Sequence, residues 1–530
     1  MLLGAACGSV NAAKDPIGAA NRLPPSLEQK VQDLTDVLEA DGYEVARGYW
    51  TLWAAEDCKL PLQTVGFCYG NNPTAPYVLA VLPHWPDELV DKRLHHTLLQ
   101  GQKGMTPNYR LGEREALVVL AELPPAARYF GYMTNVFTRE TGLVTTDPVY
   151  QRLVDEGAED LLGIIFGFSP NPDRMMMIAT IGDSINNVLI EDQSTENWGQ
   201  QRFFVTTPDE DMADAMTDAL ANLEGVLPTH VFTEQVGRDL VRLGYGPEAD
   251  DFITYMRYSV PNDLALGEQW REQFPVAVLR VRDRDGDVAV NPYDIPEYDT
   301  KACPTNEPAE LGADLNSLVG AVKAYWDQPG EDPQHEAFRS LTVWVDLVGQ
   351  HCLGYDGPPA TDTEPPPEGG ITLPRGPSGC LGDNQDDEPL ISSGTFNLDD
   401  DQVIAVVGAI GTKTGNATYT SVSVNWFPEL VGVLNRDDTV LEESAKKFKL
   451  ALSNPEVYKK FYVYYFARDC TGLYPWCQEV PKSLIPEGDT IKIVQRNYVA
   501  PGSSRAPDPS CVLNPVAIEF NGSEGNRPEM

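Results

Sequence analysis

The sequence predicts a mixed α+β protein of two or three domains, and three observations lead to this fold class. Helical patterns, with apolar residues every three or four positions, occur beside short apolar runs typical of strands. Strand-like runs dominate the C-terminal part, which we therefore expect to be β-rich. The chain has 530 residues, which at roughly 150 residues per domain corresponds to about two to four domains.

Changes in composition along the chain predict where these domains begin and end. We expect a leader or tether over residues 1–25 and a mixed α/β body over 26–355, with a possible subdivision near residue 155. Residues 356–395 are rich in Pro, Gly and acidic residues, which is typical of a loop or linker. The remaining residues, 396–530, form the expected β-rich C-terminal domain.

The first half of the body begins with a helix and continues with strands. A helix is predicted over Pro25–Glu39, because Leu27, Val31 and Leu34 recur at helical spacing. Five apolar or aromatic runs then predict strands, which are Tyr77–Pro83, Ala116–Leu120, Ala127–Phe137, Met175–Ile181 and Phe203–Thr206.

The second half of the body is predicted to contain three helices and a hairpin. The first helix follows Thr207, which can cap it, with Glu210 completing a capping box and Gly225 as a terminator. We expect the other helices over Glu234–Leu243 and Ala249–Tyr258. The hairpin is predicted by Asp285-Gly286, with strands Val276–Arg282 and Val288–Val290 on either side.

The C-terminal domain is predicted mainly from apolar and aromatic runs bounded by polar segments. One helix is expected near Val440–Leu452. The expected strands are Val403–Val407, Tyr419–Trp426, Phe461–Phe466 and Ile491–Val494.

The charge excludes some classes of partner. The chain has 79 Asp and Glu against 39 Lys and Arg, a formal net charge of −40. Nucleic acid and anionic lipid need a basic patch, so we expect neither as a partner. The chain is nevertheless 42% hydrophobic, which is enough to build folded cores. An acidic, solvated exterior would suit a halophilic or marine habitat.

The N-terminus resembles the end of a bacterial lipoprotein signal peptide. An apolar stretch and small residues lead to Cys7 in the segment Leu3-Gly4-Ala5-Ala6-Cys7. The resemblance implies an exported protein with a lipid anchor at Cys7, and the alternative is an ordinary N-terminal tail. No run approaches the roughly 18 apolar residues of a spanning helix, so no membrane span is expected.

The cysteines also favour an extracellular, periplasmic or outer-surface location. There are nine, and if Cys7 is lipidated, eight remain for four disulfides. Two pairs are close in sequence, Cys58 with Cys68 and Cys470 with Cys477; four other cysteines could pair over longer spans. Buried free thiols are the alternative. The sequence contains no Cys/His cluster that would indicate a metal site, and we expect no cofactor.

A strand that ends in Gly182-Asp183-Ser184 resembles the first sequence block of the GDSL, or SGNH, serine hydrolases. The resemblance implies that Ser184 is the nucleophile, His335 the base and Asp332 its orienting partner, in the form Asp332-Pro-Gln-His335. Asn262 and Gly225 would then stabilise the oxyanion. The block around Asn262 departs from the family, since Val260 stands where a Gly is expected. The alternative interpretation is a structural turn, which Gly and Asp favour.

Two functions therefore remain open. The first is an exported hydrolase of an ester or glycan ester, acting on a small-molecule or polymer substrate. The second is a non-catalytic surface or secreted binding protein, with a ligand-binding face made by aromatic residues of the C-terminal domain. Packing in a core is the alternative, and the favoured, explanation of those residues, which lie at 458–466 with Tyr474 and Trp476.

Overall fold

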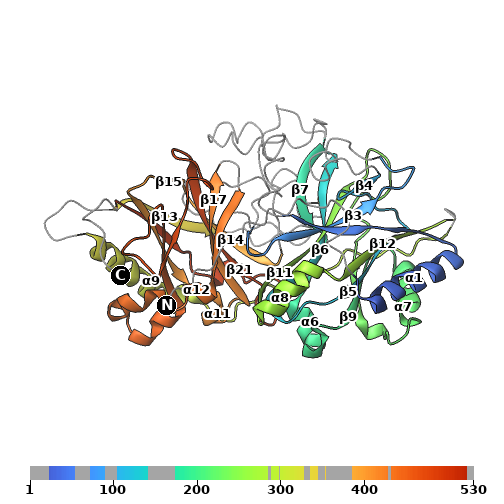
Figure 1. Cartoon of the computed structure of the whole chain (residues 1–530), viewed down its shortest axis with the longest axis horizontal. Coiled ribbons are helices and arrows are strands. Elements are labelled where there is room, and N and C mark those ends of the chain that lie inside the picture. The colour runs from blue at the N-terminus through green and yellow to red at the C-terminus, as the bar shows by residue number, and fades with distance from the viewer. Residues whose placement is uncertain are drawn as a thin grey trace.

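The computed structural model describes residues 23–53, 72–89, 104–140, 174–284, 288–297, 299–327, 335–343, 353, 385–427 and 431–521. In these ranges the chain forms two halves that lie side by side along the longest axis of the molecule (Figure 1). Strands build sheets of five and seven strands in the N-terminal half and a ten-stranded sheet in the C-terminal half. The expected α+β class with a β-rich C-terminal part is confirmed.

The N-terminal half contains both smaller sheets and four α-helices among the described residues. The helices are α1 (Pro25–Ala40), α6 (Asn187–Gln193), α7 (Glu210–Ala221) and α8 (Leu264–Gln273). The five-stranded sheet has the order β1 (Tyr43–Arg47), β12 (Val276–Asp283), β5 (Glu115–Glu122), β9 (Gln201–Thr207) and β10 (Val231–Gln235). The seven-stranded sheet has the order β2 (Tyr49–Trp53), β3 (Tyr77–Pro83), β11 (Asp251–Pro261), β6 (Ala127–Glu140) and β7 (Arg174–Thr180), with β4 (Met105–Thr106) beside β3 and β8 (Ile185–Asn186) beside β6.

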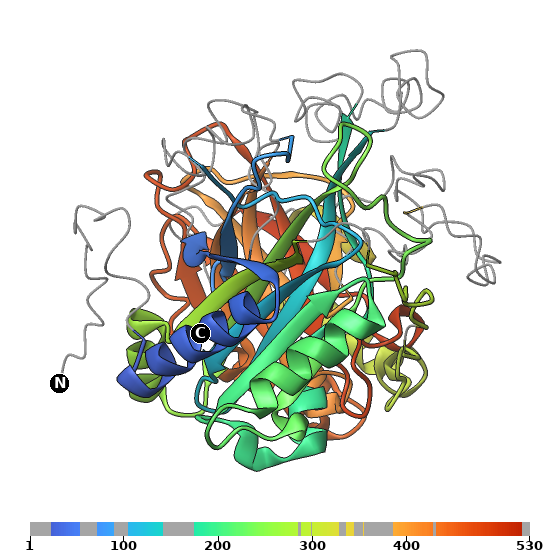
Figure 2. The same ribbon diagram turned by 90° about the vertical axis from the view of Figure 1, so that its right-hand side faces the viewer.

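The N-terminal half has three layers, which are the helices α1 and α7, the five-stranded sheet and the seven-stranded sheet. Alternation of side chains along the strands explains this arrangement. On β5, Val118 and Leu120 pack in one cluster with α1 and α7, whereas Leu117 and Val119 pack in another with the seven-stranded sheet. Successive side chains of a strand point to opposite faces, so both faces of the five-stranded sheet are buried. Figure 2 shows α1 and α7 covering the outer face of this sheet.

The C-terminal half is one strongly curved sheet. Its order is β18 (Val431–Asp437), β17 (Tyr419–Phe427), β21 (Thr490–Tyr498), β14 (Asp387–Ser392), β13 (His335–Val343), β22 (Val516–Asn521), β16 (Gln402–Ala409), β19 (Phe461–Ala467) and β20 (Cys477–Glu479), with β15 (Phe396–Asn397) beside β21. Val422 of β17 and Tyr462 of β19 share one core cluster although their strands are far apart in this order. The sheet therefore curls around that cluster.

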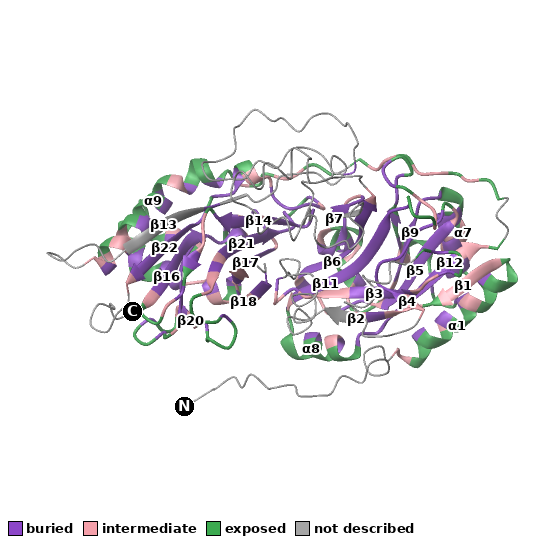
Figure 3. Cartoon of the chain, turned by 90° about the horizontal axis from the view of Figure 1, so that it is seen from above, coloured by how far each residue is buried: buried purple, intermediate pink, exposed green. Residues whose placement is uncertain are grey.

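Helical segments cover the other face of the ten-stranded sheet. Leu318 and Trp326 of α9 (Glu307–Trp326) pack with Val463 and Tyr465 of β19. Figure 3 shows the strands of both halves largely buried and the outer faces of α1, α8 and α9 exposed. The shorter helices are α11 (Gly411–Thr414), α12 (Asp438–Leu441), η2 (Thr195–Asn197), η3 (Pro228–His230), η5 (Ser444–Ala451), η6 (Pro455–Lys460) and η7 (Pro509–Cys511).

The expected domain boundary at residue 355 is corrected by the strand pairing. β13 lies between β14 and β22, so it belongs to the C-terminal half together with α9. The Pro-, Gly- and acid-rich segment thus falls between two strands that pair with each other and does not separate two domains. β14 also lies within the range expected as linker, while residues 1–22 and 354–384 lie outside the described residues.

Two expected helices do not form. The segment 249–258 lies mostly in β11, which pairs with both β3 and β6, whereas 234–243 contains only the end of β10 followed by turns. Nearly every residue of β11 is buried, so its sequence lacks the two-residue alternation that identifies a half-exposed strand. The helix after Thr207 is confirmed, but Asp209 caps it by accepting a hydrogen bond from Met212 N, whereas Thr207 donates to the Glu115 carbonyl.

Two disulfides join described cysteines. Cys470–Cys477 closes a short loop, as its spacing predicted, and Cys303–Cys511 spans 208 residues. The other five cysteines, Cys7 among them, lie outside the described residues. Within the described part of the chain, no helix is long and apolar enough to cross a membrane. The two disulfides are compatible with an exported protein.

Candidate functional site

Ser184 lies at the contact between the two halves. Its side chain is 1% exposed, and its hydroxyl donates a hydrogen bond to the carboxylate of Asp386, just before β14. Asn186 Nδ2 donates to Ser184 Oγ at 3.0 Å, and the Tyr129 hydroxyl donates to Asp386 Oδ2 at 2.7 Å. Burial raises the pKa of Asp386 to about 6. Ser184 therefore helps to satisfy a buried carboxyl group that joins the halves.

The other residues of the serine-hydrolase hypothesis lie in different places. Asp332 is outside the described residues; His335 begins β13, where its backbone pairs with Phe520, and its side chain is likewise not described. Gly225 follows α7 with φ of +75°, and Asn262 is in the turn between β11 and α8. In the described part of the chain, no hydrogen bond joins Ser184 to Asn262 or Gly225.

A buried polar network strengthens the contact between the halves. Arg257 of β11 donates to the Tyr498 hydroxyl of β21 at 2.7 Å and lies 3.7 Å from Asp387 of β14. Its guanidinium also lies over the Tyr77 ring, 4.5 Å from the centroid. Burial raises the pKa of Tyr498 well above its usual range, which keeps the hydroxyl protonated. These contacts hold one half against the other.

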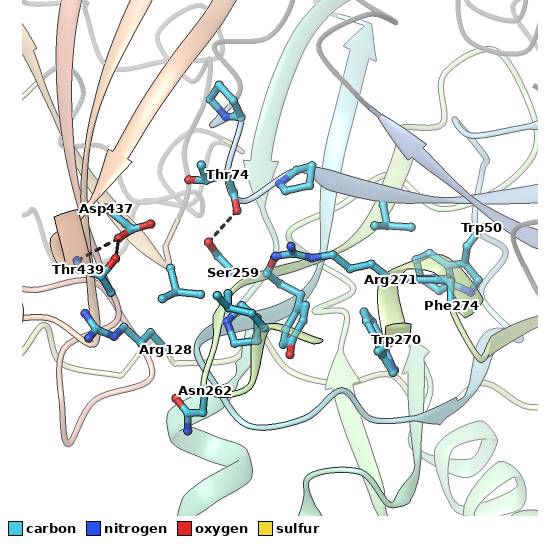
Figure 4. Close-up of a pocket in the computed structure, with 17 residues that line it drawn as sticks. Trp50, Thr74, Arg128, Ser259, Asn262, Trp270, Arg271, Phe274, Asp437 and Thr439 are labelled. Atoms are coloured by element: carbon cyan, nitrogen blue, oxygen red, sulfur yellow. Dashed lines mark hydrogen bonds between the residues drawn. The ribbon is translucent and has the colours of Figure 1, made fainter. Parts of the chain in front are cut away.

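A cleft of about 910 Å³ lies beside this network, between the halves (Figure 4). The N-terminal half contributes residues of β2, β3, β11 and α8, and the C-terminal half contributes Asp437 and Thr439 at the start of α12. Much of the wall is apolar, and Leu264, one of the lining residues, is 70% exposed.

Three aromatic side chains form one end of the cleft. Trp50 of β2 and Trp270 of α8 both pack on Phe274, with ring centroids 6.1 and 5.0 Å apart. All three are largely buried, so the cleft meets only parts of their rings. Trp270 Nε1 donates to the Glu122 carbonyl at 2.8 Å, which holds the ring and leaves its apolar surface to the cleft.

Unusual backbone conformations surround the same cleft. Val260 and Phe274, which line it, have φ of +51° and +39°. Side chains with a Cβ rarely adopt positive φ, and strained residues of this kind concentrate at binding and active sites. Gly267 allows α8 to approach β11 closely, because a Cβ there would lie 2.5 Å from Pro261 Cγ. The packing of α8 thus maintains the shape of the cleft.

The two arginines of the cleft are paired with carboxylates within the protein. Arg128 of β6 forms an ion pair with the buried Asp438. Arg271 Nη1 lies 2.5 Å from Glu268 Oε1, and Arg271 Nη2 donates to the Tyr258 carbonyl at 3.0 Å. Because each guanidinium has a carboxylate neighbour, the cleft does not present an uncompensated cation.

The aromatic residues of the C-terminal half form a core. Tyr458, Phe461, Tyr462, Tyr464, Tyr465 and Phe466 are all buried. The core-packing interpretation is confirmed, and these six residues do not make an exposed binding face. Tyr474 in the disulfide-closed loop is 56% exposed. No group of three or more potential metal ligands is found among the described residues.

Comparison with known proteins gives no family. No family model and no curated protein matches the chain. Among solved structures, the chain is similar to an uncharacterized protein from Burkholderia cenocepacia at 9% identity and a TM-score of 0.35. The alignment covers 94% of this chain and 87% of that one.

Proposed function

We propose that the protein is an exported, non-catalytic binding protein that holds a small, mainly apolar ligand in the cleft between its halves. The observation that carries the proposal is the cleft itself, with a volume of about 910 Å³, apolar walls and an aromatic end. Ligand sites are typically concave, mainly apolar and roughly 300–1,000 Å³ in size.

The rigidity of the walls supports binding by a preformed site. Trp50, Trp270 and Phe274 pack on one another, and α8 is held close to β11 at Gly267. A ligand that enters such a site orders few side chains, which reduces the entropic cost of association.

The surroundings of Ser184 favour binding over hydrolysis. A nucleophilic serine must be reachable by substrate and must pass its proton to a base such as histidine. Ser184 is buried, and its hydroxyl proton is directed to Asp386. Export is supported by the two disulfides, and a lipid tether at Cys7 rests on the resemblance of the N-terminus to a lipoprotein signal.

A fluorophosphonate probe tests the hydrolase alternative. We expect no labelling of the folded protein, measured by gel fluorescence and mass spectrometry. Ser184→Ala should instead lower the free energy of unfolding by about 1–3 kcal/mol, because Asp386 loses a buried donor. Labelling of the wild-type protein that disappears in Ser184→Ala would support the hydrolase and contradict our proposal.

An uncharged apolar dye tests the binding site. We expect N-phenylnaphthylamine to bind the wild-type protein with a blue-shifted, enhanced emission, and Thr439→Trp to weaken binding at least about tenfold by filling the cleft. Thr471→Trp is the matched control. Both threonines are exposed and donate to an aspartate two residues earlier, but Thr471 lies in the disulfide-closed loop.

The two variants separate the possible results. Loss of dye binding in Thr439→Trp alone supports the cleft as the site. Equal binding by both variants and the wild-type protein, or no dye binding by folded wild-type protein, would contradict the proposal. Near-ultraviolet circular dichroism shows in each case whether the protein is folded.

A further inference from the structure

The cleft has two ends of different chemistry. Figure 4 shows Trp50, Trp270 and Phe274 together on one side, and Arg128, Asp437 and Thr439 on the other. The aromatic end offers carbon surface, because the indole N–H of Trp270 is already bonded to the Glu122 carbonyl. A ligand group at that end is therefore apolar.

The polar end offers both donors and acceptors of hydrogen bonds. Arg128 has five N–H donors and a side chain that is 30% exposed, so the pair with Asp438 leaves donor capacity. Asn262 is exposed, and its amide both donates and accepts. Asp437 accepts from the Thr439 backbone N–H at 2.9 Å, and a carboxylate can accept further bonds.

The charges at the cleft disfavour an ionic head group. A bound anion would lie near Asp437 and near the carboxylates that already compensate Arg128 and Arg271. A cationic head group would offer no acceptor to the N–H donors of Arg128. A neutral group avoids both disadvantages, because a hydroxyl or amide can use the donors and acceptors together.

We infer that the ligand is an uncharged amphiphile, with a hydroxyl- or amide-bearing head at the Arg128 and Asn262 end and an apolar body against Trp50, Trp270 and Phe274. This inference rests on the proposed function, and it adds the chemical class of the ligand and its direction in the cleft. The head group of this amphiphile is either rich in hydroxyl groups, as a sugar is, or an amide.

Displacement of bound N-phenylnaphthylamine by three octyl compounds tests the head group. Octyl glucoside, octanoate and octyltrimethylammonium share one tail and differ in charge, and all are used below their micelle concentrations with the full-length protein. We expect octyl glucoside to displace the dye at a concentration about tenfold lower than either ion. Equal or stronger displacement by an ion would overturn the head-group assignment while leaving the proposed function intact.

A substitution tests the direction of binding. Asn262→Ala should weaken displacement by octyl glucoside about fivefold more than it weakens binding of the dye, since the apolar end is intact. Asn222→Ala, at an exposed asparagine after α7, is the matched control and should match the wild-type protein. If Asn262→Ala also matches the wild-type protein, the placement of the head is wrong. If the folded wild-type protein binds no dye, the proposed function fails and this inference fails with it.

Discussion

Replacing Arg280 by methionine should lower the free energy of unfolding by about 3–5 kcal/mol at neutral pH. Arg280 of β12 is 0% exposed and pairs with two buried carboxylates, Glu88 at 2.6 Å and Glu115. It also donates to the Pro83 carbonyl at 3.0 Å. Methionine fills similar space but leaves both carboxylates without their cation, and an uncompensated buried charge is expensive. Chemical denaturation followed by tryptophan fluorescence measures the loss.

Arg282 provides a matched control on the same strand. It also pairs with two carboxylates, Glu44 and Asp87, but these are 40% and 59% exposed. Solvent screens such pairs, so Arg282→Met should cost no more than about 1 kcal/mol. Adding Glu88→Gln and Glu115→Gln to Arg280→Met should recover part of the loss, because the orphaned charges are removed. Similar losses for Arg280→Met and Arg282→Met would show that burial of the carboxylates does not determine the effect.

The second large effect is a dependence of stability on pH that comes from Glu234. This carboxyl group lies between the two sheets of the N-terminal half and accepts from Thr134 N at 2.7 Å, Thr134 Oγ at 2.6 Å and Thr206 Oγ at 2.7 Å. Burial raises its pKa from 4.5 to about 7, because the charged form loses hydration that these donors only partly replace.

The sign of the effect follows from proton linkage. Between these two pKa values the folded protein keeps a proton that the unfolded chain releases, so stability falls as pH rises. The contribution of Glu234 is complete below the unfolded value and is lost as pH rises through about 7, for a total of about 3 kcal/mol.

Glu234→Gln isolates this contribution. From a pH below 4.5 to a pH above about 7, the variant should lose about 3 kcal/mol less stability than the wild-type protein, measured by denaturation at a series of pH values. Glu196→Gln, at an exposed glutamate, should follow the wild-type curve. The Glu234 prediction is wrong if the Glu234→Gln curve runs parallel to that of the wild-type protein.

Local pattern was sufficient for many elements of the fold. The apolar run at 77–83 predicted β3, and the capping signals at Thr207 and Glu210 predicted the helix that forms α7. It failed for β11, where Phe252, Tyr255 and Met256 stand at helical spacing although the segment is a strand. A strand buried on both faces loses its alternation, so its apolar residues can fit a helix as well. Its pairing with β3 and β6 decides the conformation.

The candidate site was much less accessible to sequence reasoning. Trp50, Trp270 and Phe274 are drawn together from β2 and the α8 region, and the two residues at the start of α12 come from the other half. No motif or spacing connects them. The available motif was at Ser184, whose partner Asp386 is 202 residues away. Gly-Asp-Ser spacing could not reveal that this partner is a buried carboxyl group.

The sequence by itself determined the α+β class, four of the ten strands of the C-terminal sheet, the acidic exterior and the short Cys470–Cys477 loop. These properties depend on composition or on residues a few positions apart, where periodicity and turn chemistry act. The tertiary structure decided the boundary between the halves, the Cys303–Cys511 bridge, the surroundings of Ser184 and the cleft. Each of these depends on how distant strands pair and pack, because a contact across hundreds of residues leaves no local pattern in the chain.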